Sequence, residues 1–350
     1  MNVVRTAIVG MGIGKLNGLA IARHPRGRVV ALCDLLEDRM AEFAKELPEP
    51  VRCYTDYKEL CKDKEVDAIF VGSPNQWHVP IALEAIRCDK HVLVTKPLAD
   101  QLAPARRLIG IAEAAGVVNM MSLSTRYSRE TQYLGRLVRS GELGEVYYGR
   151  ARSIRRSGIP DWSLGFIEAG GGAFRDMGVH VLDSAWWMMG MPQPVSVSGV
   201  GGAKFGPLGR GFWEYRTPSR DFFSKYASDD YAGGIIRFEN GAGLQVESFW
   251  ASHQPDNLQI ELFGTEAGAQ LHPLTIYRTV EGAPSDAVVK LPKGPDPWEM
   301  IADHFINCIL DGAPCGASLR HGLIVQEMLE AMLQSAQTGR EVRIRTRAEK

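Results

Sequence analysis

The sequence lacks the features that stabilise small secreted proteins or anchor a chain in a membrane. Its six cysteines are scattered over 350 residues and form no C-x-x-C pair, and a chain of this length can bury a core without disulfides. We interpret the cysteines as reduced thiols, because neither a disulfide framework nor a zinc motif has this spacing. No apolar run approaches the roughly 20 residues that span a bilayer, and the first residues show no basic segment or twin arginine. We therefore expect a cytoplasmic protein.

An excess of charge of either sign is also missing. The 40 lysine and arginine residues nearly balance the 41 aspartate and glutamate residues, for a net charge of -1. This balance gives no electrostatic reason to expect nucleic acid or an anionic membrane as a partner. On a loose scale of about 150 residues per domain, the length suggests two domains.

The first third of the chain alternates short apolar strands with helical segments. Helical spacing of apolar residues covers residues 37–46, 80–87 and 103–114. This alternation predicts an α/β domain, with a doubly wound parallel sheet and helices on both faces. Strands that are apolar throughout fit a sheet covered on both sides. We expect the strands at residues 6–9, 29–33, 51–54, 68–72, 91–95 and 117–121.

Beyond residue 122 the pattern changes to longer strands, and two of them flank Asn240-Gly241. This dipeptide favours a tight hairpin because both residues tolerate positive φ. We therefore expect residues 1–122 to form the parallel-sheet domain. Residues 123–350 should form an α+β domain with a large, open-faced, mainly antiparallel sheet. Its strands are expected at residues 146–154, 195–200, 231–238, 242–250 and 258–263, with helices at 298–311 and 319–338.

The first predicted strand leads into residues 10–14 (GMGIG), with a helix expected to begin near Gly14. Glycines at such a turn let the backbone approach a pyrophosphate, which binds the N–H groups at the helix N-terminus. The usual spacing is G-x-G-x-x-G. Here the third glycine is one residue early and Lys15 takes its place, so Gly18 is left to make the close helix–strand contact. An ordinary tight turn would use the same glycines, so the motif needs support from its context.

The context is an acidic residue, Asp34, at the end of the second predicted strand. An acid about 20 residues beyond the first glycine suits a ribose 2′-hydroxyl. The next residues are Leu35 and Leu36 rather than arginine, and the Asp34 carboxylate would repel a 2′-phosphate. We therefore predict NAD rather than NADP, although Arg39 lies nearby in the sequence.

A dehydrogenase also needs a group that takes the hydroxyl proton and a donor that fixes the substrate oxygen. Lys96, before Pro97, ends a predicted strand, where ligands gather in open α/β sheets; taken alone, such a lysine is more often a solvated surface residue. Asp176 and His180 are spaced i,i+4, so on a helix they share one face. His180 could act as a base oriented by Asp176, or the two could be a capping aspartate and a structural histidine. No third ligand joins them at a suitable spacing, so we predict no metal site.

A small basic cluster has two interpretations. Arg150, Arg152, Arg155 and Arg156 lie close together in the sequence. They fit a solvated strand and loop, or an anion site for an acidic or phosphorylated substrate.

Taken together, these motifs resemble the Gfo/Idh/MocA oxidoreductases, which include glucose–fructose oxidoreductase and inositol dehydrogenase. The resemblance rests on the glycine turn and on residues 73–78 (SPNQWH), 95–97 (TKP) and 170–180, and it continues to residue 342. It implies a Rossmann domain followed by an open-faced sheet that commonly forms the oligomer interface, and hence a homodimer or homotetramer. It also implies that the substrate is a sugar, polyol or related hydroxy compound.

By position, the resemblance implies that Lys96, Asp176 and His180 are the catalytic residues. Lys96 would hold the substrate oxygen, His180 would exchange its proton, and Asp176 would orient the pair. Arg126 and Trp162 fall where substrate or nicotinamide contacts often occur. The positions that match cofactor contacts are Gly10, Gly12, Ile13, Gly14, Asp34, Ser73, Asn75, His78, Lys96 and Pro97.

The chain departs from the family pattern at Thr95, which replaces the usual glutamate before Lys-Pro. A neutral neighbour removes one interaction that would favour charged Lys96. The family's Lys-Pro bond is often cis, and we predict the same for Lys96–Pro97. Three functions remain open: an NAD-dependent dehydrogenase or reductase, which we favour; an NAD-retaining enzyme that processes glycosides by transient oxidation; and a non-catalytic sugar or NAD sensor.

Overall fold

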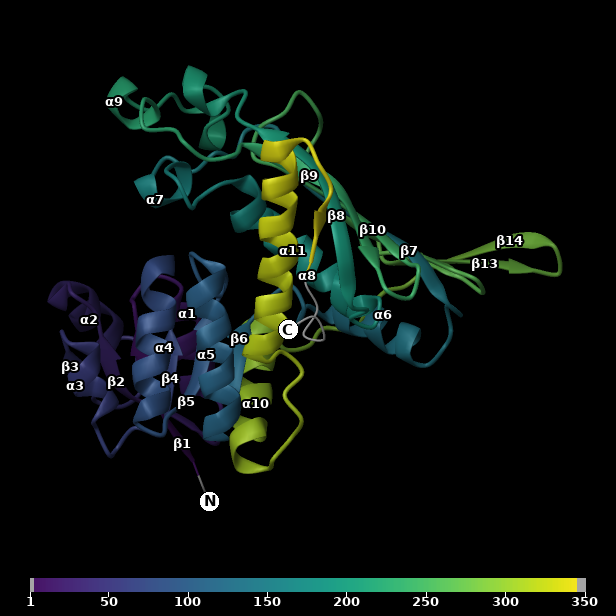
Figure 1. Cartoon of the computed structure of the whole chain (residues 1–350). Coiled ribbons are helices and arrows are strands. Elements are labelled where there is room, and N and C mark those ends of the chain that lie inside the picture. Colours follow the sequence, from purple (N-terminus) through teal and green to yellow (C-terminus); the bar gives the residue numbers. More distant parts are fainter. Residues whose placement is uncertain (1–2, 345–350) are drawn as a thin grey trace. The chain divides into compact units, whose positions relative to one another are not determined.

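The computed structural model describes residues 3–344, and the chain divides into two compact units. The first unit comprises Met1–Tyr127 and Gly294–Gln326, and the second comprises Ser128–Lys293 and Glu327–Lys350 (Figure 1). The helix α11 (Leu319–Thr338) contributes residues to both. Within residues 3–344, no helix is long and apolar enough to cross a membrane.

The first unit is built on a six-stranded sheet in the order β3-β2-β1-β4-β5-β6, with every neighbouring pair parallel. The predicted doubly wound Rossmann arrangement is therefore confirmed. The strands are β1 (Val4–Val9), β2 (Gly27–Cys33), β3 (Arg52–Tyr54), β4 (Ala68–Val71), β5 (His91–Thr95) and β6 (Asn119–Ser122). The helices between them are α1 (Gly14–Arg23), α2 (Glu37–Ala44), α3 (Tyr57–Cys61), α4 (His78–Arg87) and α5 (Leu102–Ala115), with a short 3-10 turn η1 (Asn75–Trp77).

A segment from the C-terminal third of the chain completes the first unit. The helix α10 (Pro297–Leu310) begins with a capping box between Asp296 and Glu299 and buries its apolar face in the core of the parallel sheet domain. The expected division at residue 122 placed this segment with the second domain. It joins the first unit because Ile301, Phe305 and Ile306 are almost fully buried there, and burying such side chains is worth roughly 1.5–3 kcal/mol each.

The second unit is built on a nine-stranded sheet in the order β14-β13-β12-β11-β7-β10-β9-β8-β15. Its neighbouring strands are antiparallel except for β7 and β10, so the prediction of a mainly antiparallel sheet is confirmed. The predicted hairpin joins β9 and β10, with Gly241 at a φ of +83°. The strands are β7 (Val146–Ile154), β8 (Pro194–Gly202), β9 (Tyr231–Phe238), β10 (Gly243–Phe249), β11 (Asn257–Gly264), β12 (Gly268–Gln270), β13 (Thr275–Val280), β14 (Ala283–Val288) and β15 (Val342–Arg343).

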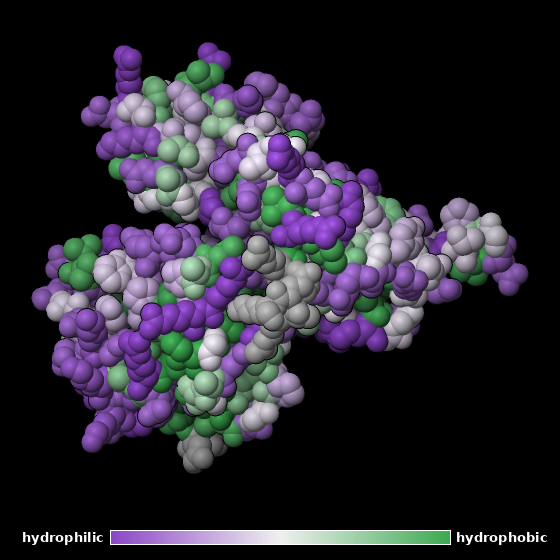
Figure 2. All heavy atoms as spheres, in the orientation of Figure 1, coloured by the Kyte–Doolittle hydropathy of each residue, from purple (hydrophilic) through white to green (hydrophobic). Residues whose placement is uncertain are grey.

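Helices cover one face of this sheet. The apolar helix α8 (Val179–Met188) packs on β7, β10 and β11, and Trp186 is almost fully buried within it. The strands β13 and β14 form a hairpin that extends beyond the rest of this sheet (Figure 1), and hydrophilic and hydrophobic residues are intermixed over its surface (Figure 2). The helices are α6 (Arg129–Arg139), α7 (Leu164–Ile167), α8 (Val179–Met188) and α9 (Arg220–Phe223), with a π-helical turn η2 (Phe174–Gly178) and 3-10 turns η3 (Gly206–Leu208) and η4 (Trp213–Tyr215).

Candidate active site

The glycine turn lies where β1 and β4 end side by side. Gly10 has a φ of +87°, and a Cβ atom there would lie 2.5 Å from the carbonyl oxygen of Gly72. The Gly10 N–H donates to the carbonyl oxygen of Cys33 at 2.9 Å, and the Gly72 N–H donates to the carbonyl oxygen of Val9 at 2.8 Å. Glycine is therefore required at position 10 by both conformation and space.

The other glycines of the motif divide into two roles. A Cβ atom on Gly12 would meet nothing within 4 Å, so the backbone there is open to a ligand. Gly14 and Gly18 face inward instead, because a Cβ atom would lie 2.8 Å from Ile8 at position 14 and 2.8 Å from Phe43 at position 18. The predicted close contact of Gly18 with the strand is also present, because a Cβ atom there would lie 3.2 Å from Ile8 of β1. The helix α1 begins at Gly14, and among residues 3–344 no side chain caps its N-terminus.

Asp34 ties the end of β2 to this turn. Its carboxylate accepts hydrogen bonds from the N–H of Met11 at 2.8 Å and of Leu36 at 3.1 Å. The side chain is only half-buried, so its remaining lone pairs can accept from a ribose hydroxyl. Leu35 and Leu36 are 84% and 52% exposed and place no positive charge beside the carboxylate.

Ser73 and His78 join the ends of β4 and β5. His78 is fully buried, and its two ring nitrogens lie 2.7 Å from the carbonyl oxygens of Ser73 and Pro97. Burial lowers the pKa of His78, although both carbonyls act in the opposite direction. In the structure the His78 side chain positions the two strand ends, and its predicted cofactor contact stays a prediction. The Oγ atom of Ser73 is buried with no hydrogen-bond partner within the described part of the chain, so a ligand could supply one.

Lys96 follows β5, is half-buried, and is joined to Pro97 by a cis peptide bond, as predicted. Because the strands are parallel, their carboxyl ends meet at one edge of the sheet. Asp34, Gly10, Ser73 and Lys96 follow β2, β1, β4 and β5, which are adjacent in that order. Asn75, half-buried in η1, belongs to the same edge. An open glycine backbone, an uncapped helix N-terminus, a buried hydroxyl without a partner and a strand-end carboxylate together fit a dinucleotide.

Arg126 has a different environment. It is 1% exposed, and it donates to the carbonyl oxygen of Gly316 at 2.7 Å. Burial and the nearby Arg126 guanidinium lower the pKa of His321 to about 4, so this ring is neutral near pH 7. In the structure Arg126 holds the connection between α10 and α11, and its predicted ligand contact stays a prediction.

In the second unit, Asp176 lies in the π-helical turn η2 and His180 lies in α8, which continues it. Both side chains are half-buried. The indole N–H of Trp250 donates to the Asp176 carboxylate at 3.1 Å, which fixes that side chain from the sheet. Burial lowers the pKa of Arg155, while the nearby carboxylates of Asp176 and Asp256 act in the opposite direction. Isolated π turns occur often at functional sites.

Asp229 holds the start of this helical segment, and it is not among the residues predicted from the sequence. Its carboxylate accepts from the N–H of Phe174 at 2.9 Å, and its carbonyl accepts from the N–H of Ala173 at 3.0 Å. Gly172, with a φ of +117°, leaves no space for a Cβ atom beside that carboxylate. Burial raises the pKa of Asp229 to about 6, although the Phe174 N–H and Arg175 act against this shift. No sequence signal marks such a long-range cap.

Trp162 is 58% exposed and stands in a row of aromatic side chains. Its ring packs edge-on against Phe166 at 5.7 Å and against Trp213 at 5.8 Å between centroids, and Phe166 continues the row to Trp250 at 6.4 Å. Trp250 is the residue that binds Asp176. The row therefore connects an exposed indole face with one predicted catalytic residue.

The basic cluster separates into parts with different partners. Arg150 and Arg152 each bind Glu261 at 2.8 Å, so they belong to the sheet. Arg156 instead lines an open pocket of about 480 Å³. The lining side chains of this pocket include no acid, and its other basic members are Lys204, Arg210, Arg216 and His253.

Comparisons with known proteins agree with this arrangement. A family model described as the oxidoreductase family with an NAD-binding Rossmann fold matches residues 4–123, and the GFO/IDH/MocA C-terminal domain matches residues 131–270. A D-glucoside 3-dehydrogenase of Escherichia coli (strain K12) is 28% identical, with 97% of each chain covered. A scyllo-inositol 2-dehydrogenase (NAD(+)) of Bacillus subtilis (strain 168) is 25% identical, with 88% of this chain and 87% of the relative covered.

Solved structures extend the agreement to the fold. GenD2 from gentamicin A biosynthesis, crystallised in complex with NAD, is 25% identical and has a TM-score of 0.78, with 99% of this chain and 97% of GenD2 covered. The two family models, the full-length relatives and the shared fold lead to one conclusion. The chain belongs to the Gfo/Idh/MocA family of NAD-binding oxidoreductases.

Proposed function

We propose that the protein is an NAD-dependent dehydrogenase that oxidises a secondary alcohol of a sugar, cyclitol or glycoside. The observation that carries the proposal is the order of Asp34, Gly10, Ser73 and Lys96 along one sheet edge, because it sets the lysine on the same edge as the dinucleotide turn. The relatives named as D-glucoside 3-dehydrogenase and scyllo-inositol 2-dehydrogenase support the substrate class.

The proposed roles follow the chemistry that each side chain offers. When bound, NAD supplies the hydride acceptor. Lys96 holds the substrate oxygen through its ammonium group, which stabilises negative charge on that oxygen as its proton leaves. His180 takes the proton, since an imidazole accepts protons near neutral pH. Asp176 orients His180 and favours its charged form, and the Trp250 N–H keeps the Asp176 carboxylate in place.

Asp34 sets the proposed preference for NAD over NADP. Its carboxylate suits the two hydroxyls of an adenosine ribose. A 2′-phosphate at the same place would be repelled by this carboxylate, and positions 35 and 36 hold leucines rather than an arginine that could compensate its charge. Trp162 is the proposed platform for the sugar ring, because an exposed indole face can pack against the apolar face of a pyranose.

The test is a survey of substrates with NAD, in which the absorbance of the reduced nicotinamide reports turnover. The compounds are aldoses, methyl glycosides, inositols and sugar acids, the last because of the basic pocket around Arg156. The wild type runs beside Lys96→Met and a matched control, Lys45→Met, whose exposed side chain pairs with Glu42 at the end of α2. We expect turnover by the wild type and the control and none by Lys96→Met.

Two other results would redirect the proposal. Cleavage of a glycoside by enzyme that retains its cofactor, with no net change in reduced nicotinamide, would favour transient oxidation. Sugar and NAD binding without turnover of any compound would favour a sensor. Equal turnover by Lys96→Met and the wild type would contradict the role assigned to Lys96.

A further inference from the structure

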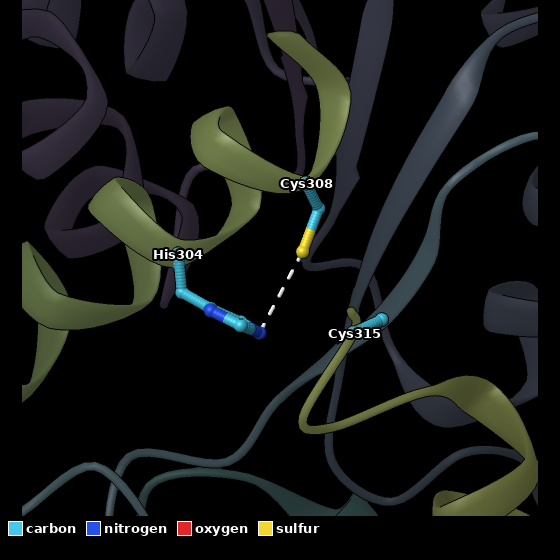
Figure 3. Close-up of side chains that lie close together, drawn as sticks. All are labelled: His304, Cys308 and Cys315. Carbon is cyan, nitrogen blue, oxygen red and sulfur yellow. Dashed lines mark hydrogen bonds between the residues drawn. The ribbon is translucent and has the colours of Figure 1, made fainter. Parts of the chain in front are cut away.

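Three metal-binding side chains converge in the first unit, far along the chain from the glycine turn. His304 and Cys308 stand on successive turns of α10, and Cys315 lies on the segment that follows. Figure 3 shows the side chains of His304 and Cys308 pointing toward one another, with Cys315 beside them. One ring nitrogen of His304 and the two Sγ atoms all lie within 4.8 Å of one another.

The distance between Cys308 and His304 fits a tetrahedral zinc ion. Zinc binds thiolate sulfur at about 2.3 Å and imidazole nitrogen at about 2.0–2.1 Å, so two such ligands at the tetrahedral angle lie about 3.6 Å apart. The Sγ atom of Cys308 lies 3.6 Å from Nε2 of His304. Two thiolates and one neutral imidazole would balance the charge of one zinc ion, which suits a site where Cys308 is buried and the other two side chains are half-buried.

The hydrogen bonds around the cluster set the histidine in the tautomer that zinc requires. The Gly316 N–H donates to Nε2 of His304 at 2.9 Å, so Nε2 carries the lone pair and the proton is on Nδ1. Zn²⁺ at this lone pair would displace the Gly316 N–H, which directly follows Cys315 in the chain and would then be available to its thiolate. Backbone N–H groups that donate to metal-bound thiolates are typical of outer-shell support.

We propose that His304, Cys308 and Cys315 bind one Zn²⁺ ion, with water in the fourth position. Within residues 3–344, the cluster contains these three donors. Each thiol releases one proton as its sulfur binds, so one Zn²⁺ replaces two protons and no electron is transferred. The inference does not depend on the proposed dehydrogenase activity.

The ion would fasten the connection between α10 and α11 to the edge of the parallel sheet. The Met121 N–H donates to Ala317 at 2.7 Å, and the Cys315 thiol faces the carbonyl oxygen of Asn119 at 3.8 Å. Both partners belong to β6, the last strand of the sheet. A metal that joins Cys315 to α10 would therefore hold this connection, which already pairs with β6, against the edge of the sheet.

The test is a titration of reduced, metal-free, untagged protein with Co²⁺, which reports thiolate ligands by a charge-transfer band in the near ultraviolet. We expect one Co²⁺ per chain, displacement of Co²⁺ by Zn²⁺, and a rise in Tm of roughly 5 °C when Zn²⁺ is in excess. Cys315→Ser and His304→Ala should each weaken binding roughly 100-fold or more. Cys53→Ser, at an exposed cysteine on β3, is the matched control and should bind like the wild type.

A second measurement keeps the test informative if a variant fails to fold. In the wild type, Zn²⁺ should protect two thiols from a thiol reagent and leave Cys53 reactive. No charge-transfer band, binding that is equal in Cys315→Ser and the wild type, or unchanged thiol reactivity with Zn²⁺ would overturn the proposal.

Discussion

The carboxylate of Asp34 accepts a hydrogen bond from the N–H of Met11 at 2.8 Å, so the residue that follows β2 is bonded to the glycine turn that follows β1. Asp34→Asn should weaken NADH binding by roughly 10–100-fold, because a charged acceptor is worth about 1.5–3 kcal/mol. The same change should reduce the difference in binding affinity between NADH and NADPH. Fluorescence titration with both cofactors checks this, with Asp38→Asn on the exposed surface of α2 as the control. Unchanged NADH affinity in Asp34→Asn would contradict the assignment.

Two glycines of the turn should respond differently to the same substitution. Gly10→Ala forces a Cβ atom to 2.5 Å from Gly72 at positive φ, and should lower the free energy of unfolding by about 2–4 kcal/mol. Gly12→Ala meets nothing within 4 Å, and should change it by less than about 0.5 kcal/mol. Gly12→Ala should nevertheless weaken NADH binding at least about tenfold, because the methyl group occupies the approach of the pyrophosphate. Urea unfolding and NADH titration separate the two effects, and tight NADH binding by Gly12→Ala would be inconsistent with the site.

Trp250→Phe should lower kcat by roughly tenfold while leaving the affinity for NADH unchanged, because it removes the N–H that fixes Asp176. Trp186→Phe is the control, since it removes an equally buried indole N–H that donates to Pro192 at 2.8 Å. Both variants should lose similar stability. The pH profile of kcat should shift only in Trp250→Phe, because in the proposed mechanism Asp176 favours the charged form of His180. Equal kcat values for the two variants would contradict the role of Trp250 in positioning Asp176 for catalysis.

Asp229 should make stability depend on pH between about 4 and 6. Its pKa is raised to about 6 in the folded chain, so the folded state binds a proton that the unfolded state has released. The stability from this group is complete below pH 4 and is lost as pH rises through 6. Arg175 faces the carboxylate as a favourable charge and Asp230 as an unfavourable one.

Asp229→Asn should therefore flatten the dependence of the free energy of unfolding on pH in that window. At pH 7 the variant should be more stable than the wild type by on the order of 1–2 kcal/mol, after allowance for partial exposure. Urea unfolding at pH 4 and pH 7 measures the difference. A variant that is equally destabilised at both values would show that the carboxylate charge is needed as a cap.

Much of the fold could be predicted because local patterns carry it. The strands β5, β7 and β9 begin and end where apolar or alternating residues begin and end, and their bounds agree with the expected ones. The strands β12 to β14 were not expected. β14 reads Ala-Pro-Ser-Asp-Ala-Val and is exposed throughout, so pairing with β13, rather than an apolar pattern, defines it.

The site shows the same limit. The glycine turn and Asp34 are local patterns, and they could be identified from spacing alone. Asp229 contacts Phe174 across 55 residues of sequence. Cys315 lies beside α10 only because the chain turns back after that helix ends. Arg126 matched a family position, but its burial and its bond to Gly316 depend on a segment almost 200 residues away.

The most direct test of the central claim follows hydride transfer itself. A sugar or cyclitol identified in the substrate survey is prepared with deuterium on the carbon that is oxidised, mixed with enzyme and NAD for a single turnover, and the cofactor is analysed by mass spectrometry. The account predicts deuterium on the nicotinamide ring, formed roughly 10²–10⁴-fold more slowly by Lys96→Met and by His180→Asn. Oxidised substrate without deuterium on the cofactor, or transfer at the wild-type rate in both variants, would contradict it.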